Sequence, residues 1–448
     1  MKENMNYRVK IDKRSMKRLF HLLLLAPLLS SAQEYMHLND SSNKGIHFEH
    51  ELNWQQVQEK AKRENKYIFV ECYATWCGPC KRMDKEVFAA DSTGEFMNKR
   101  FVSVKLQMDS SKQDDANVQA WYAEAHAMIV FYKVDVLPTF LFFDSTGKIV
   151  HKGLGYQKAP DFINLAMNAA NPAKQYYTLL RAYQDGKKDY PVMPYLANSA
   201  RTLKDSKLAD TIAADYLHHL DKLSLKEICT KTNLDFVAGF AKILTSKDKV
   251  FDCIYRRPAM ADTVEHNKGF SERLVNYMVN KEDITPVMTA AKKDSIEPNW
   301  AKVSRNITHH FGAAYVEKNV VRAKVGWYRF SKDWKNYTKF LTRQLDMENI
   351  ENIPDGLMSM VYLNGSAWDI FQYSDNKEEL AKAVVWSQRA IEMSPQTGEL
   401  VDTKANLLYK LGKKDDALPL EKKAVELSPK DQELITNLQK MEHGEPTW

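Results

Sequence analysis

Hydrophobic positions follow two different patterns along the chain. Between residues 45 and 170, short apolar runs of strand character, such as Lys66–Ala74, alternate with amphipathic helical stretches, such as Asn53–Glu64. After Asn171-Pro172 the strand pattern ends, and residues 173–448 consist of successive amphipathic helical segments separated by short polar turns. The pattern predicts a mixed sheet with helices on both faces, followed by an all-α region.

The α/β part is predicted to end in a hairpin and a closing helix. Ser145-Thr146-Gly147 is typical of a tight turn, so the apolar runs on either side of it are expected to pair. Asp91 has the side chain of a helix N-cap. The further predicted elements are helices over Cys77–Phe88, Asp91–Asn98, Asp114–Val130 and Ala159–Ala170, and strands over Phe101–Met108, Thr139–Asp144 and Lys148–Lys152.

A repeat is visible near the C-terminus. Ala390-Ile391-Glu392-Met393-Ser394-Pro395 matches Ala424-Val425-Glu426-Leu427-Ser428-Pro429, at an offset of 34 residues for every member. This offset is the period of the tetratricopeptide repeat, in which each unit is one helical hairpin. We therefore expect tetratricopeptide-type hairpins over residues 361–448, the earlier one with about four extra residues in its inter-helix loop. Residues 171–360 are expected to be helical and repeat-like, without a period that can be aligned.

The N-terminus has the pattern of a secretory signal peptide. A basic stretch ends at Arg18, an apolar run too short to span a bilayer follows over Leu19–Leu29, and Ser30 and Ala32 are small. This pattern predicts cleavage after Ala32 and an exported, periplasmic protein, with an N-terminal anchor helix as the alternative. The two predicted N-terminal segments are a signal peptide over residues 1–32 and a linker over residues 33–44.

Composition and charge narrow the class of protein. Hydrophobic residues make up 44% and charged residues 27% of the 448 residues, which is typical of a globular protein. The formal net charge is +6, but residues 1–32 alone have a net charge of +5. The remainder of the chain is close to neutral and lacks the electrostatic signature of a nucleic-acid-binding protein.

Two of the five cysteines lie in the motif Trp76-Cys77-Gly78-Pro79-Cys80-Lys81. The motif follows a strand and opens a helix, where unpaired N–H groups and the positive end of the helix dipole favour a Cys77 thiolate. Cys80 lies one turn further on, close enough to resolve a mixed disulfide. Pro79 shapes the turn without requiring an N–H. The residues predicted to tune the thiolate are Gly78, Pro79 and Lys81.

These residues resemble the thioredoxin superfamily, whose active-site string is WCGPCK. Leu137-Pro138-Thr139 precedes a hydrophobic strand, where the family has a cis-proline that faces the reactive sulfur and borders the substrate groove. Gly153 and Gly155 fall where the family has a glycine beside that groove. The resemblance covers roughly residues 45–170. It implies that clients contact Trp76, Leu137, Pro138 and Gly155.

Glu71 lies six residues before Cys77. Members of the family usually have a buried Asp at this position, which accepts a proton from the second cysteine. Glu keeps the carboxylate but adds a methylene, so its reach differs. A carboxyl group in a buried strand should have a raised pKa, which suits proton transfer near neutral pH. The resemblance therefore implies three catalytic residues, which are Cys77, Cys80 and Glu71.

The cysteines could also have other roles. A structural zinc knuckle needs four ligands, and no second CxxC or CxxH motif accompanies Cys77 and Cys80. We therefore expect no metal and no cofactor beyond a redox-active disulfide, with a static disulfide as the other alternative. Cys72 should be a buried, inert thiol. Cys229 and Cys253 could form a disulfide or stay free.

The sequence predicts a thiol–disulfide oxidoreductase that acts on protein disulfides. The Gly-Pro pair resembles reducing thioredoxins, which favours the reductase or isomerase direction. The partners would be client thiols or disulfides and a membrane or exported electron donor. The alternative is an interaction scaffold, in which tetratricopeptide-type helices bind a peptide or protein and the thioredoxin-like domain is a tether or a minor activity.

Overall fold

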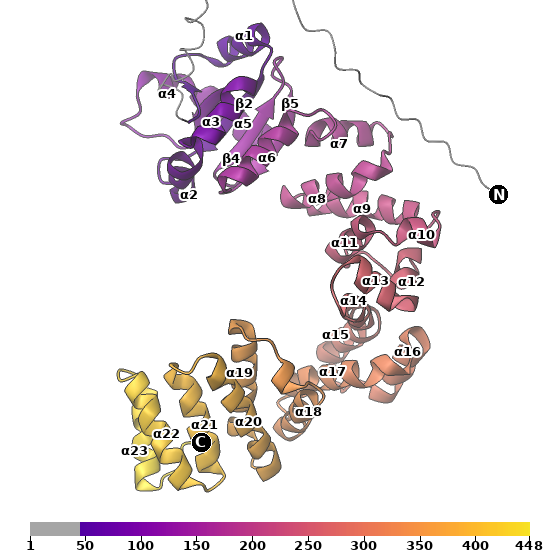
Figure 1. Ribbon diagram of the computed structural model, residues 1–448, viewed down its shortest axis with the longest axis vertical. Helices are drawn as coiled ribbons and strands as arrows, with labels where there is room; N and C mark the ends of the chain where they lie inside the picture. Colours follow the sequence, from indigo (N-terminus) through magenta and orange to yellow (C-terminus); the bar gives the residue numbers. More distant parts are fainter. Residues whose placement is uncertain (1–44) are drawn as a thin grey trace, which may run out of the picture. The chain divides into compact units, whose positions relative to one another are not determined.

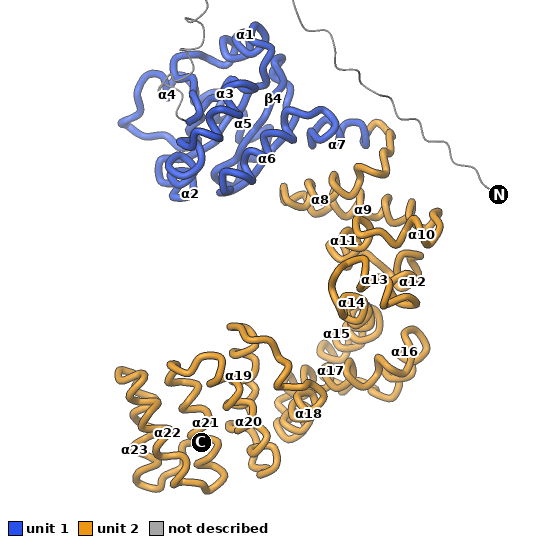
Figure 2. The backbone as a smooth tube through the Cα atoms, in the orientation of Figure 1, with its two compact units in different colours: residues 1–184 blue, residues 185–448 orange. Residues whose placement is uncertain are grey.

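A computed structural model describes residues 45–448, so the predicted signal peptide and linker lie outside the described residues. The first compact unit ends at Gln184, and the second comprises Asp185–Trp448 (Figure 2). No helix within residues 45–448 combines the length and the apolar character needed to cross a bilayer. The α/β fold followed by a helical region confirms the predicted fold class.

A five-stranded mixed sheet forms the centre of the first unit (Figure 1). The strand order is β1-β3-β2-β4-β5. Strands β1 and β2 run parallel to β3, whereas β4 runs antiparallel to both β2 and β5. The two-residue strand β1 was not predicted, because so short a segment shows no alternation. The strands are β1 (Phe48–Glu49), β2 (Tyr67–Tyr73), β3 (Phe101–Gln107), β4 (Thr139–Phe143) and β5 (Ile149–Leu154).

Helices cover both faces of this sheet. Ile68, Val70 and Cys72 of β2 pack with α1 and α5, whereas Phe69 packs with α2, η1, α3 and α6 on the opposite face. This alternation follows from the two-residue period of a strand. The helical segments of the first unit are α1 (Trp54–Glu64), α2 (Gly78–Met83), the π-helical η1 (Asp84–Phe88), α3 (Asp91–Arg100), α4 (Ala116–Ala120), α5 (Tyr122–Tyr132), α6 (Ala159–Ala169) and α7 (Tyr176–Gln184).

Local predictions in this unit needed two corrections. Asp91 is the first residue of α3 rather than its N-cap, which is Ala90 and forms no side-chain capping bond. The predicted helix over Asp114–Val130 is broken at Trp121 into α4 and α5. The side chain of Asp115 caps α4, as it accepts a hydrogen bond from the Val118 N–H.

The first unit extends beyond the predicted domain end at residue 170, because α7 packs on β5. The Tyr176 N–H donates to Nδ1 of His151 at 2.9 Å, and Arg181 donates to the Ile149 carbonyl oxygen at 3.1 Å. Burial lowers the pKa of His151 to about 4, so its ring is neutral and its Nδ1 accepts this bond at neutral pH. Helix α7 is therefore held by side chains at both of its ends.

The second unit is helical throughout, apart from its turns (Figure 1). One disulfide lies within it, between Cys229 and Cys253, whose Cα atoms are 6.2 Å apart. Its segments are η2 (Tyr190–Val192), α8 (Met193–Thr202), α9 (Ser206–Leu220), α10 (Leu225–Ile228), α11 (Lys231–Gly239), α12 (Lys249–Arg256), α13 (Pro258–Val264), α14 (Phe270–Val279), η3 (Asn280–Ile284), α15 (Thr285–Asp294), α16 (Trp300–Phe311), η4 (Ala313–Tyr315), α17 (Val316–Ser331), α18 (Trp334–Asp346), η5 (Ile350–Asn352), α19 (Leu357–Tyr373), α20 (Lys377–Met393), α21 (Gly398–Lys410), α22 (Lys414–Leu427) and α23 (Gln432–His443).

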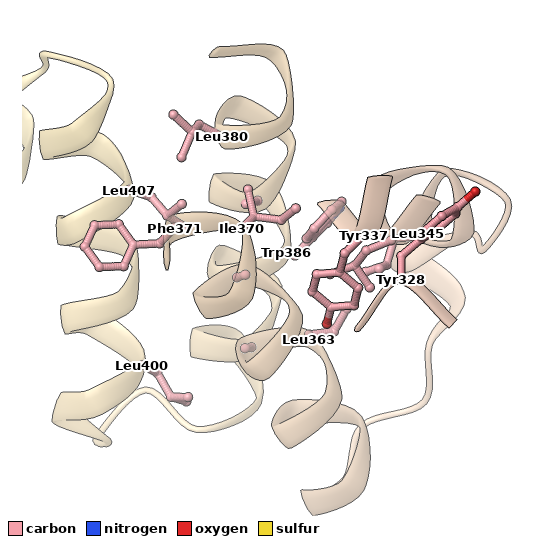
Figure 3. Packing of buried hydrophobic residues seen from close by; sticks show 14 of the residues in the cluster. Tyr328, Tyr337, Leu345, Leu363, Ile370, Phe371, Leu380, Trp386, Leu400 and Leu407 are labelled. Atoms are coloured by element: carbon pink, nitrogen blue, oxygen red, sulfur yellow. The ribbon is translucent and has the colours of Figure 1, made fainter. Parts of the chain in front are cut away.

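The two copies of the six-residue motif, which are 34 residues apart, lie at the C-terminal ends of α20 and α22. These two helices are therefore equivalent members of successive hairpins. Ala390 and Ala424 are both fully buried, which explains the small residue at this point of each copy. The prediction of extra residues in the earlier loop is wrong, because residues 374–376 and 411–413 form connections of equal length. The extra residues instead lengthen α19 and α20. Figure 3 shows a buried core to which α18, α19, α20 and α21 contribute, including Tyr337, Leu363, Ile370, Trp386 and Leu407.

Candidate functional site

The cysteine motif lies where β2 ends and α2 begins. Cys77 is the N-cap of α2, with an extended backbone (φ −75°, ψ 103°), and the Cys80 N–H points at its Sγ at 3.1 Å. Pro79 occupies the first turn, where a missing N–H leaves no partner unsatisfied. Cys77 and Cys80 form a disulfide with a Cα separation of 5.3 Å. In the reduced protein, the same first-turn N–H would stabilise a Cys77 thiolate.

The disulfide is itself almost buried, but its surroundings are exposed. Cys77 and Cys80 are 2% and 1% exposed, whereas Trp76 is 73% exposed. A large ring that stays in water beside a reactive sulfur offers an apolar contact to an approaching chain. Gly78, Pro79 and Lys81 are also exposed, so the motif faces solvent along one edge.

The residue that precedes the predicted proline lies beside the cysteines. The Leu137–Pro138 peptide bond is cis, and Leu137 packs against the cluster of Ala74, Cys77 and Cys80. The Gly155 N–H donates to the Pro138 carbonyl oxygen at 2.8 Å, with Gly155 at a φ of +74° that favours glycine. The sheet therefore brings together the motif after β2, the start of β4 and the end of β5.

Gly153 and Gly155 have different roles, although both were expected beside the groove. A Cβ at Gly153 would lie 2.3 Å from Cδ2 of Leu165, so this glycine allows α6 to approach β5. Gly155 contacts the proline through its N–H. The structure thus gives Gly153 a packing role, and its place beside the groove stays a prediction.

Glu71 is fully buried on the face of β2 that carries α2. Nζ of Lys105 lies 3.2 Å from Oε2 of Glu71, and the same ammonium contacts Asp84 at the end of α2. Burial raises the pKa of Glu71 to about 7, against the lowering effect of the Lys105 charge. Glu71 is therefore poised to take up or release a proton near neutral pH.

Lys105 and Asp84 are functional candidates that the sequence analysis missed. The signal was present, since Lys105 is the one charged residue of the strand Phe101–Gln107. Its meaning depends on sheet register, because Lys105 pairs with Glu71 across β2 and β3. Lys81, predicted as a tuning residue, is exposed and forms no ion pair within residues 45–448.

Cys72 lies on the opposite face of β2 from Glu71. It is fully buried in the cluster that packs against α1 and α5, and burial raises the pKa of its thiol far above the usual range. A thiol in this environment stays protonated and out of reach of a client. This placement agrees with the prediction of an inert side chain.

Comparisons with known proteins match the first unit. Residues 54–170 match the model of a thioredoxin-like domain. The thiol:disulfide interchange protein DsbD of Yersinia pestis is 30% identical over 160 residues, which is 34% of this chain and 25% of that protein. DsbD of Colwellia psychrerythraea is 30% identical over 152 residues, or 32% and 23% of the two chains. This chain therefore spans about a quarter of the length of these relatives.

One solved structure extends the comparison. It is the solution structure of a candidate disulphide-isomerase from Bacteroides thetaiotaomicron, with 31% sequence identity to this chain. The match covers 28% of this chain and 93% of that protein, with a TM-score of 0.24.

Proposed function

Because residues 54–170 form a domain of the thioredoxin superfamily, we propose that this chain is an exported thiol–disulfide oxidoreductase acting on protein disulfides. The observation that carries the proposal is the Cys77–Cys80 disulfide at the start of α2, beside the cis Leu137–Pro138 bond. The similarity to disulfide interchange proteins supports the same chemistry. The similarity covers about a third of this chain, and the proposal assigns the same activity to the chain as a whole.

In the reducing direction, the Cys77 thiolate attacks one sulfur of a client disulfide. A mixed disulfide forms, and the other client sulfur leaves as a thiolate that takes up a proton. The Cys80 thiolate then attacks Sγ of Cys77, which releases the second client thiol and closes the Cys77–Cys80 disulfide. Two electrons pass to the client, and the protein is left oxidised. An exported or membrane-bound electron donor restores the dithiol.

Glu71 would act in the second step. Cys80 is 1% exposed, and a buried thiol needs an internal acceptor to lose its proton. Glu71 lies on the face of β2 that packs against α2, and its pKa is raised to about 7. The positive charge of Lys105 would keep the pKa of Glu71 from rising further. Glu71 and Lys105 would thus set the pH range of the reaction.

Clients would bind along the exposed edge of the motif. Trp76 offers an open apolar surface, Leu137 packs against both cysteines, and Pro138 and Gly155 are joined to each other by a backbone hydrogen bond directly after Leu137. A client segment in extended conformation would lie beside Pro138. The Gly-Pro pair between the cysteines favours reduction or isomerisation over oxidation, as in the proteins that the motif resembles.

Export is proposed from the N-terminal pattern of residues 1–32. The Cys229–Cys253 disulfide supports it, because disulfides persist in oxidising compartments such as the periplasm. The helical second unit would select clients through its tetratricopeptide-type hairpins. The repeat at Ala390 and Ala424 favours the scaffold alternative as well, in which partner binding is the main role.

A reduction assay tests the proposal. The full chain should accelerate the reduction of insulin disulfides by dithiothreitol, and the Cys77→Ser variant should not. The Cys72→Ala variant is the matched control, because it removes a thiol that lies on the other face of the sheet. Equal rates for the full chain and Cys77→Ser would reject the oxidoreductase and leave the scaffold.

A further inference from the structure

The connection between β5 and α6, residues 155–158, links the cis-proline to the helix that carries the cysteines. Its first residue is Gly155, whose N–H donates to the Pro138 carbonyl oxygen at 2.8 Å. The next residue, Tyr156, contacts α2 and η1, the helical segments that follow Cys77. Two successive residues of the connection therefore contact the two parts of the candidate site.

Three contacts join this connection to α2 and η1. The Tyr156 hydroxyl donates to Oε2 of Glu86 at 2.6 Å. The guanidinium of Arg82 lies over the Tyr156 ring, with its Cζ 4.0 Å from the ring centroid, and its Nε lies 3.5 Å from Oε1 of Glu86. The Gln157 N–H is directed at Sδ of Met83 at 3.4 Å. Because Arg82 and Glu86 are four residues apart, they lie on one side of the helical segment and contact Tyr156 together.

Other constraints on the connection are few. Gly155 has a φ of +74°, and a Cβ at this position would meet no atom within 4 Å beyond its chain neighbours. Lys158 is the N-cap residue of α6, but its side chain forms no capping hydrogen bond. Among the side chains of residues 155–158, Tyr156 is the one that forms a hydrogen bond or a cation–π contact within residues 45–448. The place of the connection against α2 therefore depends mainly on Tyr156.

We propose that Tyr156 is a positioning residue for client binding, because it fixes Gly155 and Pro138 relative to the sulfur atoms. This inference rests on the proposed function, in which an extended client segment lies beside Pro138. If the connection moves away from α2, the Pro138 carbonyl and its Gly155 partner are no longer held at a fixed distance from the cysteines. An extended segment then loses contacts, whereas a small disulfide needs only the sulfur atoms. The Tyr156 contacts are solvent-exposed and individually weak, so their loss should affect binding severalfold and leave the fold intact.

Rapid mixing of the reduced full chain with excess disulfide tests this role. One substrate is a quenched fluorescent peptide with one disulfide, which gives a half-saturating concentration and a maximum rate. The other is glutathione disulfide, which gives a rate constant for a small substrate. Tyr156→Phe removes the hydroxyl and keeps the ring, Glu86→Ala removes its acceptor, and Glu86→Gln keeps an acceptor oxygen. The matched control is Tyr328→Phe, which removes a hydroxyl that donates to Glu297, also at 2.6 Å, in the second unit.

We expect Tyr156→Phe and Glu86→Ala each to raise the half-saturating peptide concentration about fivefold. The maximum rate and the rate constant for glutathione disulfide should stay unchanged. The double variant should show the same loss as each single variant, because both substitutions remove one hydrogen bond. Glu86→Gln and Tyr328→Phe should retain the half-saturating concentration of the unmodified chain.

An unchanged half-saturating concentration in Tyr156→Phe would overturn this role, even if urea unfolds the variant more easily. Losses that multiply in the double variant or an equal loss in Tyr328→Phe would overturn it as well. An equal slowing with glutathione disulfide would do the same, because it places the effect at the sulfur atoms. If the unmodified chain reduces neither disulfide, the proposed function fails and this inference fails with it. Normal reduction of both disulfides by Tyr156→Phe rejects this inference alone.

Discussion

The ammonium of Lys105 lies 3.2 Å from the carboxylate of Glu71, because β2 and β3 pair in a register that sets the two residues side by side. Burial raises the pKa of Glu71 while this cation opposes the rise. The balance of the two effects leaves a carboxyl group that titrates near pH 7. The first three predictions below depend on this pair.

Replacing Glu71 with Gln should slow the release of client from the mixed disulfide by about a hundredfold, because the amide cannot accept the Cys80 proton. In the unmodified protein this step should slow as the pH falls below about 7, where Glu71 becomes protonated. The variant should lose this dependence. Rapid mixing of the reduced protein with a labelled disulfide peptide measures the step. An unchanged rate and pH profile in the variant would remove Glu71 from the mechanism.

Replacing Lys105 with Met should shift the same pH profile upward by about one unit. Without the cation, the pKa of Glu71 rises further, so a higher pH is needed to form the carboxylate. The matched control is Lys99→Met, which removes an exposed lysine of α3 whose one ion pair within residues 45–448 is with Glu95. A profile that stays in place for Lys105→Met would show that Lys105 has no part in setting this pKa.

Glu71 should also lower the stability of the oxidised protein at high pH. The pKa is raised from 4.5 in the unfolded chain to about 7 in the folded one, so the folded state binds the proton more tightly. The protonated carboxyl group therefore contributes up to about 3 kcal/mol to the free energy of unfolding. This contribution is fully present below pH 4.5 and is lost as the pH rises through 7. Urea unfolding of Glu71→Gln should lack this loss. Parallel pH profiles for the two proteins would contradict the assignment.

The Trp76→Ala variant should affect clients more than small disulfides. The ring is 73% exposed, so its removal should leave the fold intact and remove an apolar contact. We expect kcat/KM for insulin to fall about fivefold to tenfold, with little change for a glutathione disulfide. The control is Met167→Ala, an exposed apolar residue of α6. A similar loss with both substrates would indicate a change at the sulfur atoms instead.

The Cys229–Cys253 disulfide should stabilise the second unit without contributing to redox activity. The two cysteines are 24 residues apart, and closing a loop of this length stabilises a domain by about 3 kcal/mol. The Cys229→Ser/Cys253→Ser variant should therefore unfold at lower urea concentration in the second unit and reduce insulin at the original rate. Loss of activity in a folded variant would instead connect this disulfide with the chemistry.

Local signals in the sequence were sufficient to predict the reactive motif. The apolar run of β2, the cysteines and the following helix are adjacent in the chain, so their arrangement follows from periodicity alone. The place of Pro138 came from the family resemblance. The structure brings Leu137 to the cysteines through the antiparallel pairing of β2 and β4.

Features that depend on tertiary contacts were not predicted. The partnership of Lys105 with Glu71 requires the register of two strands, and the packing role of Gly153 requires knowing that α6 crosses β5. The contact of Tyr156 with Glu86 joins residues 70 positions apart and has no sequence motif. In each case the sequence shows the residue type, but it does not show which distant residue will lie next to it in the fold.

The most direct test of the account is trapping in cells with the Cys80→Ala variant. Without the resolving thiol, Cys77 should accumulate mixed disulfides that appear as reducible adducts on a non-reducing gel, and mass spectrometry would identify the clients. The Cys77→Ala/Cys80→Ala variant should show none of them. Adducts specific to Cys77 are the predicted result. Their absence from a well-expressed protein whose Cys77 still reacts with a small alkylating agent would contradict the oxidoreductase and favour the scaffold.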